Sequence, residues 1–233
     1  NEPPSMRSAM TDTILRPDFA SNVLEAGFTT RSFAPEGTSL DETRTHLVLE
    51  VGMPLASVGQ VHRADVATVR EPGHVDAHDG LVTDQRGLLL TVIAADCGVV
   101  LLSDLEAGVV GACHSGWRGT VAGIVGETIR AMEALGSSSS RTRAYVAPCI
   151  SLEAFEVGEE VAEQFDDAVV ERRAEWPRPH VDLKAVLEGQ LRQVGVSDIE
   201  VAAGCPVLET DRFYSYRAEG GTAGRMVGFI GMR

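Results

Sequence analysis

The chain has 233 residues, 44% of them hydrophobic, and a formal net charge of −14. Its longest strongly apolar run, residues 88–95, is far shorter than the roughly 20 residues that a membrane-spanning helix needs. An acidic surface repels nucleic acid and anionic membranes, so the composition excludes both as partners and favours a protein that acts on small molecules.

In chain order, residues 1–20 are polar and contain several prolines, and we expect a mobile arm that includes an edge strand. A strand end at 27–31 carries Arg31. The capping-box spacing of Ser39 and Glu42 predicts a helix that runs to about Val51. Further strands are predicted over 58–69, 88–95, 99–102 and 108–112, with a loop over 70–78.

The second half of the chain mixes helices and strands. Apolar spacing and capping residues predict helices over 120–135, 157–165 and 182–194. Strands are predicted over 143–147, 199–203, 213–216 and 226–230, with a loop over 166–180. Because runs of strands are interrupted by helices without a regular alternation, the pattern favours an α+β fold with sheets sandwiched between helices.

Four cysteines are widely spaced and form no CxxC pair: Cys97, Cys113, Cys149 and Cys205. The start of the sequence shows no export signal, so we expect reduced thiols and a cytoplasmic protein, with a monomer favoured. No GxGxxG follows a predicted strand and no GxxxxGK[ST] occurs, which argues against a dinucleotide-binding fold and a P-loop.

Three candidate metal ligands, His62, Cys97 and His114, lie within or at the end of predicted strands. One thiolate and two imidazoles suit zinc and leave a fourth position for water or substrate. Separations of 35 and 17 residues match no local zinc motif. The same residues therefore also suit a catalytic pair in which Cys97 is the nucleophile and His114 its base, oriented by Asp79 or Asp96.

Arginines near strand ends are candidates to hold an anion in this acidic protein: Arg118, Arg217 and Arg225. Aromatic residues that are candidates to stack on a flat ring are Trp117, Phe213, Tyr214 and Tyr216. The pair Asp79-Gly80 also has a simpler interpretation, because Asp-Gly is a common turn pair.

Six motifs in order resemble the YfiH family, also called the multicopper polyphenol oxidase or laccase-domain family: QVHRADV, DGLVT, AADCGVVLLSD, GACHSGWRGT, APCI followed by FEVGEEV, and CPVLETDRFYSYRAEGGTAGR. That family includes the peptidoglycan editing factor and purine nucleoside phosphorylases. The resemblance runs from about Val58 to Ile230. It implies a four-layer α/β/β/α fold, shared with the cytotoxic necrotizing factor catalytic domain, and one laccase-type domain over residues 1–233.

The resemblance also implies a metal site of His62, Cys97 and His114 that holds zinc or, alternatively, copper. The activities it implies are phosphorolysis of adenosine, inosine, guanosine and methylthioadenosine, and deamination of adenosine. We expect the three ligands and Asp79 to take part in catalysis, with Asp79 or Asp96 carrying a proton. Residues expected to bind the nucleoside or phosphate are Arg31, Gln60, Arg118, Tyr216 and Arg217.

Other functions remain open: a copper-dependent polyphenol oxidase, a cysteine hydrolase that edits peptidoglycan precursors, and a metal-binding module without turnover. A trinuclear copper centre draws on His-x-His pairs, and none occurs among the six histidines. The chain departs from the family pattern after Arg31, where it reads SFAPEGTSLDET in place of a longer glycine-rich stretch. We therefore expect a different rim on this side of the pocket.

Overall fold

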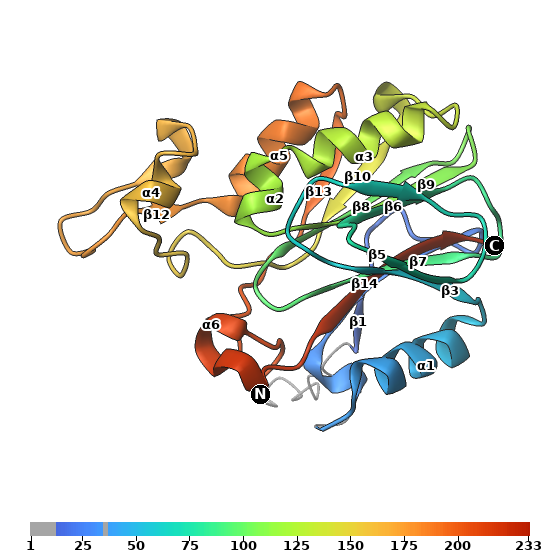
Figure 1. The fold of residues 1–233 in the computed structure, drawn as a ribbon, viewed down its shortest axis with the longest axis horizontal. Helices are drawn as coiled ribbons and strands as arrows, with labels where there is room; N and C mark the ends of the chain where they lie inside the picture. Colours follow the sequence, from blue (N-terminus) through green and yellow to red (C-terminus); the bar gives the residue numbers. More distant parts are fainter. Residues whose placement is uncertain (1–12, 35–36) are drawn as a thin grey trace, which may run out of the picture.

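The structure is a computed structural model that describes residues 13–34 and 37–233. Two six-stranded sheets pack face to face, and helices cover their outer faces (Figure 1). This order of layers confirms the predicted α/β/β/α arrangement. Within the described ranges, no helix is both long enough and apolar enough to cross a membrane.

The first sheet has the strand order β1-β2-β14-β7-β3-β5. Its strands are β1 (Ile14–Leu15), β2 (Leu24–Thr29), β14 (Met226–Met232), β7 (Leu89–Ala94), β3 (Leu55–Gly59) and β5 (Gly73–Asp76). Helix α1 (Leu40–Val51) covers the outer face, where Leu47 and Val51 pack with Phe229. The predicted capping box of Ser39 and Glu42 is present, and α1 ends at Gly52.

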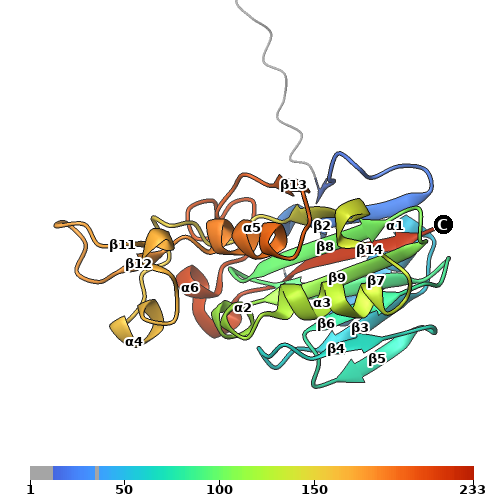
Figure 2. The same cartoon turned by 90° about the horizontal axis from the view of Figure 1, so that it is seen from above.

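The second sheet has the strand order β13-β10-β8-β9-β6-β4. Its strands are β13 (Asp198–Val201), β10 (Arg143–Val146), β8 (Gly98–Asp104), β9 (Val109–Ser115), β6 (Gly80–Thr83) and β4 (Val66–Thr68). Figure 2 shows helices α3 (Ile124–Glu133) and α5 (Leu183–Gln193) lying over this sheet.

Strand β8 shows why its sequence is continuously apolar. Val99 and Leu101 face the first sheet and belong to the core between the sheets, whereas Val100 and Leu102 face the helices. Side chains alternate between the two faces of a strand, and both faces are covered here. The absence of polar alternation thus reflects a sheet that is buried on both sides.

The described part of the predicted N-terminal arm packs against the sheets, and residues 1–12 of that arm lie outside the described residues. The expected edge strand is β1, which pairs with β2. Phe19 is buried in the core between the sheets. The backbone N–H of Asp18 donates to Glu200 on β13 at 2.7 Å. Residues 18 and 19 therefore join the free edges of the two sheets.

The predicted single strand over 58–69 is wrong. Strand β3 ends at Gly59 and β4 begins at Val66, and the two strands belong to different sheets. The residues between them cross from one sheet to the other, so His62 lies in a loop. The predicted loop over 70–78 contains the strand β5. Its residues are mostly exposed, so its sequence lacks the apolar pattern that predicts a strand.

Three predicted helices or strands differ from the structure. The helix over 120–135 is two helices, α2 (Trp117–Val121) and α3, because Gly123 between them adopts a φ of 80°. The helix over 157–165 shrinks to α4 (Glu159–Ala162). The strand over 213–216 is absent, and α6 (Tyr216–Glu219) begins there because the Ser215 hydroxyl caps it.

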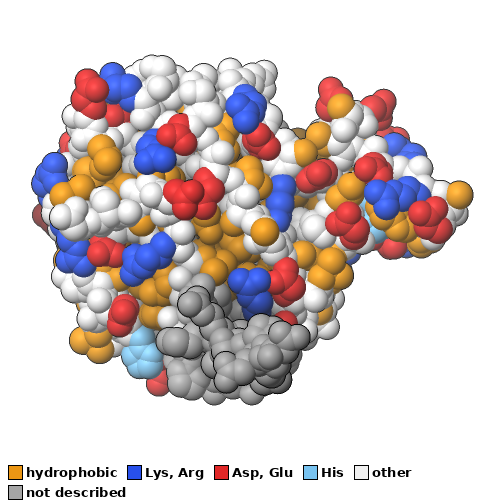
Figure 3. All heavy atoms as spheres, turned by 180° about the vertical axis from the view of Figure 1, so that it is seen from behind, with side chains coloured by type: hydrophobic (Ala, Val, Ile, Leu, Met, Phe, Trp, Pro, Cys, Tyr) orange, Lys and Arg blue, Asp and Glu red, His pale blue; other side chains and the backbone are white. Residues whose placement is uncertain are grey.

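A segment around α4 projects from one end of the sandwich (Figure 1). It contains the short pair β11 (Val170–Glu171) and β12 (His180–Val181), which lie at the ends of the predicted loop over 166–180. Acidic and basic side chains are mixed on its surface (Figure 3). One ion pair of this segment joins Arg172 and Glu159 at 2.9 Å. Within the described residues, short 3-10 helices are formed by Arg31–Phe33, Ser139–Arg141, Asp167–Val169 and Gly220–Thr222.

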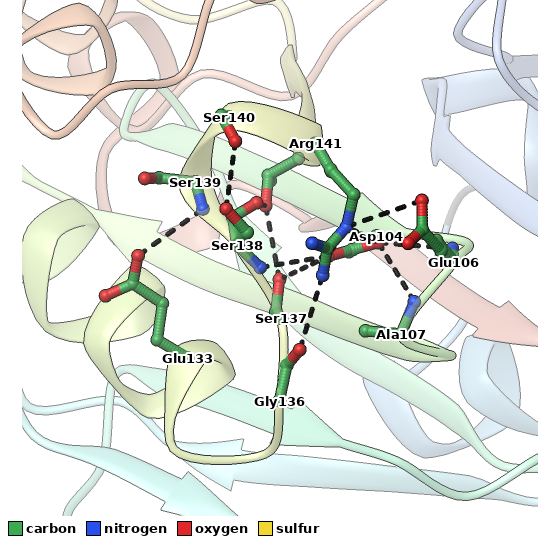
Figure 4. A network of polar contacts seen from close by, with 11 residues as sticks. Asp104, Glu106, Ala107, Glu133, Gly136, Ser137, Ser138, Ser139, Ser140 and Arg141 are labelled. Carbon is green, nitrogen blue, oxygen red and sulfur yellow. Dashed lines mark hydrogen bonds and ion pairs between the residues drawn. The ribbon is translucent and has the colours of Figure 1, made fainter.

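At the end of β8, the carboxylate of Asp104 is buried and surrounded by donors (Figure 4). It accepts from the Arg141 side chain at 2.9 Å, the Ser138 backbone at 2.9 Å and the Ala107 backbone at 3.0 Å. These bonds attach the turn after α3 and the 3-10 helix Ser139–Arg141 to the second sheet. The serine-rich stretch Ser137–Ser140 is therefore held to the sheet by a buried carboxylate.

Candidate metal centre

The three candidate ligands converge in space. The ligand atoms of His62, Cys97 and His114 lie within 4.8 Å of one another. The two imidazole rings meet edge to face, with centroids 4.9 Å apart. His62 follows β3 of the first sheet, Cys97 lies in the turn between β7 and β8, and His114 is on β9 of the second sheet. The site therefore forms where the chain crosses between the two sheets.

The Asp79 side chain forms hydrogen bonds that hold two of the three candidate ligands in place. Its carboxylate is fully buried, and Oδ1 accepts from His114 Nδ1 at 2.9 Å and from the backbone N–H of His62 at 3.0 Å. Oδ2 accepts from the backbone N–H groups of Val61 at 3.1 Å and Arg63 at 2.8 Å. These bonds hold the loop that carries His62, and they leave His114 Nε2 free to face the other ligands.

The conformation of the ligand loop is unusual, since His62 has a φ of 61°, in the left-handed region that non-glycine residues seldom adopt. The hydrogen bonds to Asp79 account for it, because they constrain three successive backbone N–H groups. Burial raises the pKa of Asp79, but its hydrogen bonds from His114 and the loop outweigh burial and lower that pKa. Asp79 is therefore a carboxylate in the folded protein.

Gly116 leaves the room in which the ligands meet. A Cβ atom at this position would lie 2.9 Å from Cδ2 of His62 and 3.1 Å from Sγ of Cys97. It would also lie 3.6 Å from Cε1 of His114. A side chain here would displace at least one ligand, so the glycine is part of the site's shape.

Cys97 and His114 shift each other's pKa. Burial alone raises the pKa of Cys97, but hydrogen bonds with His114 and His62 outweigh it and lower the pKa to about 6. Burial alone lowers the pKa of His114, but its contacts with Asp79 and Cys97 raise the pKa to about 9. Both shifts favour a thiolate beside an imidazolium, which is the charge state of a Cys–His–Asp nucleophile.

The same geometry fits a metal ion. A thiolate and two imidazoles suit zinc, and they also suit copper. His114 has its Nδ1 engaged by Asp79, as metal-binding histidines commonly have. Among the residues that the structure describes, this is the one group of three or more His, Cys, Asp or Glu side chains close enough to share an ion. The site thus has the donors for a single ion.

The ligands line a cavity of about 790 Å³. Its lining includes apolar side chains, those of Ile93, Ile150, Phe155, Leu183 and Trp117. It also includes polar and basic side chains, those of Gln60, His74, Arg44, Arg217 and Arg225. In a chain with a net charge of −14, three arginines around one cavity give it a local charge opposite to that of the whole protein.

The predicted substrate-binding residues do not all lie in the same cavity. Gln60, Tyr216 and Arg217 line the cavity with the metal ligands. Arg31 instead lines a neighbouring cavity of about 510 Å³, where it pairs with Glu219. Arg118 is exposed, and its guanidinium lies over the Trp117 ring, 4.2 Å from the centroid.

Two of the cavity residues, Gln60 and Asp96, form hydrogen bonds to the backbone. Both polar atoms of the Gln60 amide bond to the backbone of Ile93, with Nε2 donating at 2.9 Å and Oε1 accepting at 2.7 Å. This joins the ligand loop to β7. Asp96, beside Cys97, accepts the backbone N–H of Arg217 at 2.6 Å and has a φ of 86°. Burial raises the pKa of Asp96.

Arg44 is a cavity residue that the sequence analysis missed. Its side chain is only 15% exposed, and Nη1 forms an ion pair with the exposed carboxylate of Asp41 at 3.6 Å. Among the described residues, its Nε has no hydrogen-bond partner. Arg44 lies three and seven residues before Leu47 and Val51, which form the buried stripe of α1. The sequence signal for Arg44 is its spacing, which places an arginine on the same helical face as the buried Leu47 and Val51.

The family model described as multi-copper polyphenol oxidoreductase laccase matches residues 31–233. A purine nucleoside phosphorylase of Deinococcus radiodurans is 41% identical over 199 residues, which cover 82% of this chain and 76% of that protein. A protein named adenosine deaminase RL5, from an unknown prokaryotic organism, is 31% identical over 205 residues, which cover 79% of this chain and 78% of that protein.

Two solved structures share the fold. Protein NMB0706 of Neisseria meningitidis is 30% identical with a TM-score of 0.84, covering 94% of this chain and 99% of that chain. The hypothetical protein YfiH of Bacillus licheniformis is 25% identical with a TM-score of 0.82, covering 90% of this chain and 93% of that chain. The resemblance drawn from six sequence motifs is thereby confirmed.

Proposed function

The chain belongs to the multi-copper polyphenol oxidoreductase laccase family, and we propose that it is a zinc-dependent purine nucleoside phosphorylase with adenosine deaminase activity. One observation carries the proposal: the ligand atoms of His62, Cys97 and His114 lie within 4.8 Å of one another and line a cavity whose other residues include three arginines and several apolar side chains. Similar proteins named purine nucleoside phosphorylase and adenosine deaminase support this choice of substrate.

Cys97 Sγ and one ring nitrogen from each of His62 and His114 would hold the zinc ion. Zinc bound there supplies a Lewis acid that stabilises negative charge on oxygen at neutral pH. The chain's own contribution is to orient these donors. Asp79 fixes the His114 ring and the His62 loop through four hydrogen bonds, and Gly116 keeps the meeting point open.

The arginines that line the cavity are suited to phosphate. Arg44 is largely buried and pairs at 3.6 Å with the exposed carboxylate of Asp41, and Arg217 and Arg225 line the same cavity. The planar donors of a guanidinium match two phosphate oxygens. In this proposal the three arginines hold phosphate and direct one oxygen toward the anomeric carbon of the ribose.

Asp79 and Asp96 have different roles in the proposal. The oxygens of Asp79 already accept four hydrogen bonds and the residue is fully buried, so Asp79 positions ligands. Asp96 lines the cavity, and burial raises its pKa, the direction that favours a role in proton transfer. Asp96 therefore carries the proton during deamination.

A second candidate function is a cysteine hydrolase, favoured by the lowered pKa of Cys97, about 6, beside His114 and Asp79. The copper oxidase has weaker support. The described residues offer one cluster of candidate metal ligands, whereas a multicopper centre needs several. A zinc-dependent enzyme that acts on nucleosides needs only one such cluster of metal ligands.

The test measures metal content and phosphate-dependent release of base from inosine and adenosine, before and after chelation. We expect about one zinc per chain, and turnover that chelation abolishes and added zinc restores. Cys97→Ala should lose both metal and turnover. Cys113→Ala is the matched control, because Cys113 packs in the core beneath the outer helices. Metal-free protein with an alkylation-sensitive activity would replace the proposal by the cysteine hydrolase.

A further inference from the structure

Trp117 lies at the start of α2 and lines the cavity that holds the metal ligands. The guanidinium of Arg118 lies over its ring, 4.2 Å from the centroid. Arg118 is exposed, and Trp117 is half-buried and also packs against the core beneath the outer helices. The indole therefore lies between the core, the Arg118 guanidinium and the cavity, where a flat ligand could contact it.

The backbone beneath this ring is held firmly. The hydroxyl groups of Ser115 and Thr120 are 2.8 Å apart, and both residues are fully buried. The backbone N–H of Thr120 donates to the carbonyl of Gly116 at 2.9 Å. Gln190 on α5 donates to the carbonyl of Thr120 at 2.8 Å. A Cβ atom at Gly116 would lie within 3.6 Å of all three metal ligands, so the residue before Trp117 is next to the metal centre. The position of the indole is therefore tied to that of the metal centre.

We infer that Trp117 is the stacking platform for the purine base, an inference that rests on the proposed function. The apolar side chains of Ile150, Phe155 and Leu183 line the same cavity and exclude water from a base placed there. Stacking on an aromatic ring strengthens nucleobase binding by about 10- to 100-fold. Arg118 adds a cation–π contact that stabilises the ring.

Two other residues are weaker candidates for this role. Tyr216 also lines the cavity, but it is 57% exposed, so holding its ring against a base would restrict a freer side chain. Phe213 is fully buried in the core between the sheets and does not reach the cavity. Trp117 combines cavity exposure with a ring that is already held in place.

The first test is a fluorescence titration. The chain has two tryptophans, and the other one, Trp176, stacks on His180 in the projecting segment with centroids 3.8 Å apart. Trp176→Phe keeps an aromatic ring there and leaves Trp117 as the single indole. We expect adenosine to change the emission of Trp117 in this variant. D-ribose, which has no base, should leave the emission unchanged.

The second test is kinetic. Trp117→Leu keeps an apolar side chain but removes the flat ring, and we expect the KM for adenosine to rise about 10- to 100-fold. Trp117→Phe should restore most of the affinity. Zinc content and thermal unfolding temperature, measured for both variants, show whether the fold is intact, and the KM for phosphate should not change.

Calorimetry with adenosine separates the two hypotheses. Adenosine binding with unchanged Trp117 emission, together with an unchanged KM in folded Trp117→Leu, overturns the stacking platform and leaves the proposed function standing. Absence of any nucleoside binding to zinc-loaded protein overturns both. Binding that changes the emission and is weakened by Trp117→Leu supports the platform.

Discussion

His114 Nδ1 donates a 2.9 Å hydrogen bond to Oδ1 of Asp79, and both side chains are almost completely buried. The bond spans 35 residues of sequence and links β9 to the start of β6. It decides which imidazole nitrogen faces the other ligands. The same carboxylate holds the loop of His62, so one side chain sets two of the three metal donors.

Asp79→Asn is expected to weaken zinc binding by about 10- to 100-fold, the usual effect of removing a partner that orients a metal ligand. One side of an amide donates, so it cannot accept from all four of the groups that Asp79 binds. Zinc affinity measured by competition with a chromogenic chelator gives the result. Asp76→Asn is the control, since the Asp76 side chain is 93% exposed. Equal affinities for the two variants would contradict the positioning role.

Gly116→Ala is expected to abolish stoichiometric zinc binding. The added Cβ would lie 2.9 Å from Cδ2 of His62, closer than real Cβ contacts come, and 3.1 Å from Sγ of Cys97, which is tighter than most of them. Metal content of the purified variant is the measurement. Gly189→Ala on α5 is the control, because a Cβ there meets nothing within 4 Å, and the change should stabilise the helix by up to about 1 kcal/mol. Full zinc occupancy in Gly116→Ala would show that the ligands do not converge as described.

Arg44→Gln is expected to raise the KM for phosphate about tenfold or more, because the cavity loses a largely buried cation whose carboxylate partner, Asp41, is 94% exposed and 3.6 Å away. The KM for the nucleoside and the zinc content should change little. Saturation curves for each substrate separate these effects. Arg130→Gln, an exposed position on α3, controls for the loss of one positive charge. A selective rise in the nucleoside KM would argue that Arg44 contacts the nucleoside instead.

Asp104 makes the stability of the protein depend on pH. Burial alone raises its pKa, but bonds from Arg141, Ala107 and Ser138 outweigh burial and lower the pKa to about 2 (Figure 4). The folded-state pKa is below the ordinary value of 3.8, so the stabilisation is full above about pH 5 and is lost as the pH falls toward 2.

We therefore expect Asp104→Asn to lower the free energy of unfolding by about 2 kcal/mol at pH 7, with a smaller difference from the natural chain at pH 3. Urea unfolding at a series of pH values measures this difference. Asp198→Asn, which removes an exposed ion pair with Arg143, should cost less than about 1 kcal/mol. A difference for Asp104→Asn that grows on acidification would have the wrong sign.

The elements that the sequence predicted correctly are those whose signals are local. The capping box at Ser39 and Glu42 satisfies backbone groups within one turn, so α1 could be located from four residues. The apolar runs of β7, β8 and β9 are likewise continuous in the sequence. The errors fall where distant contacts override local preference. Asp79 bends the residues after β3 away from a strand, and Gly123 divides one amphipathic stretch into two helices.

The sequence by itself determined the kinds of donor available, the acidic balance of the chain and, through six motifs, its family. Only the tertiary structure decided which donors meet. The hydrogen bonds that place His62 join residues 16 to 18 positions apart, and the cavity gathers Arg44, Arg217 and Arg225 from distant segments while leaving Arg31 and Arg118 outside. Contacts of this kind depend on how two sheets pack, and packing between distant segments leaves no periodic signal along the chain.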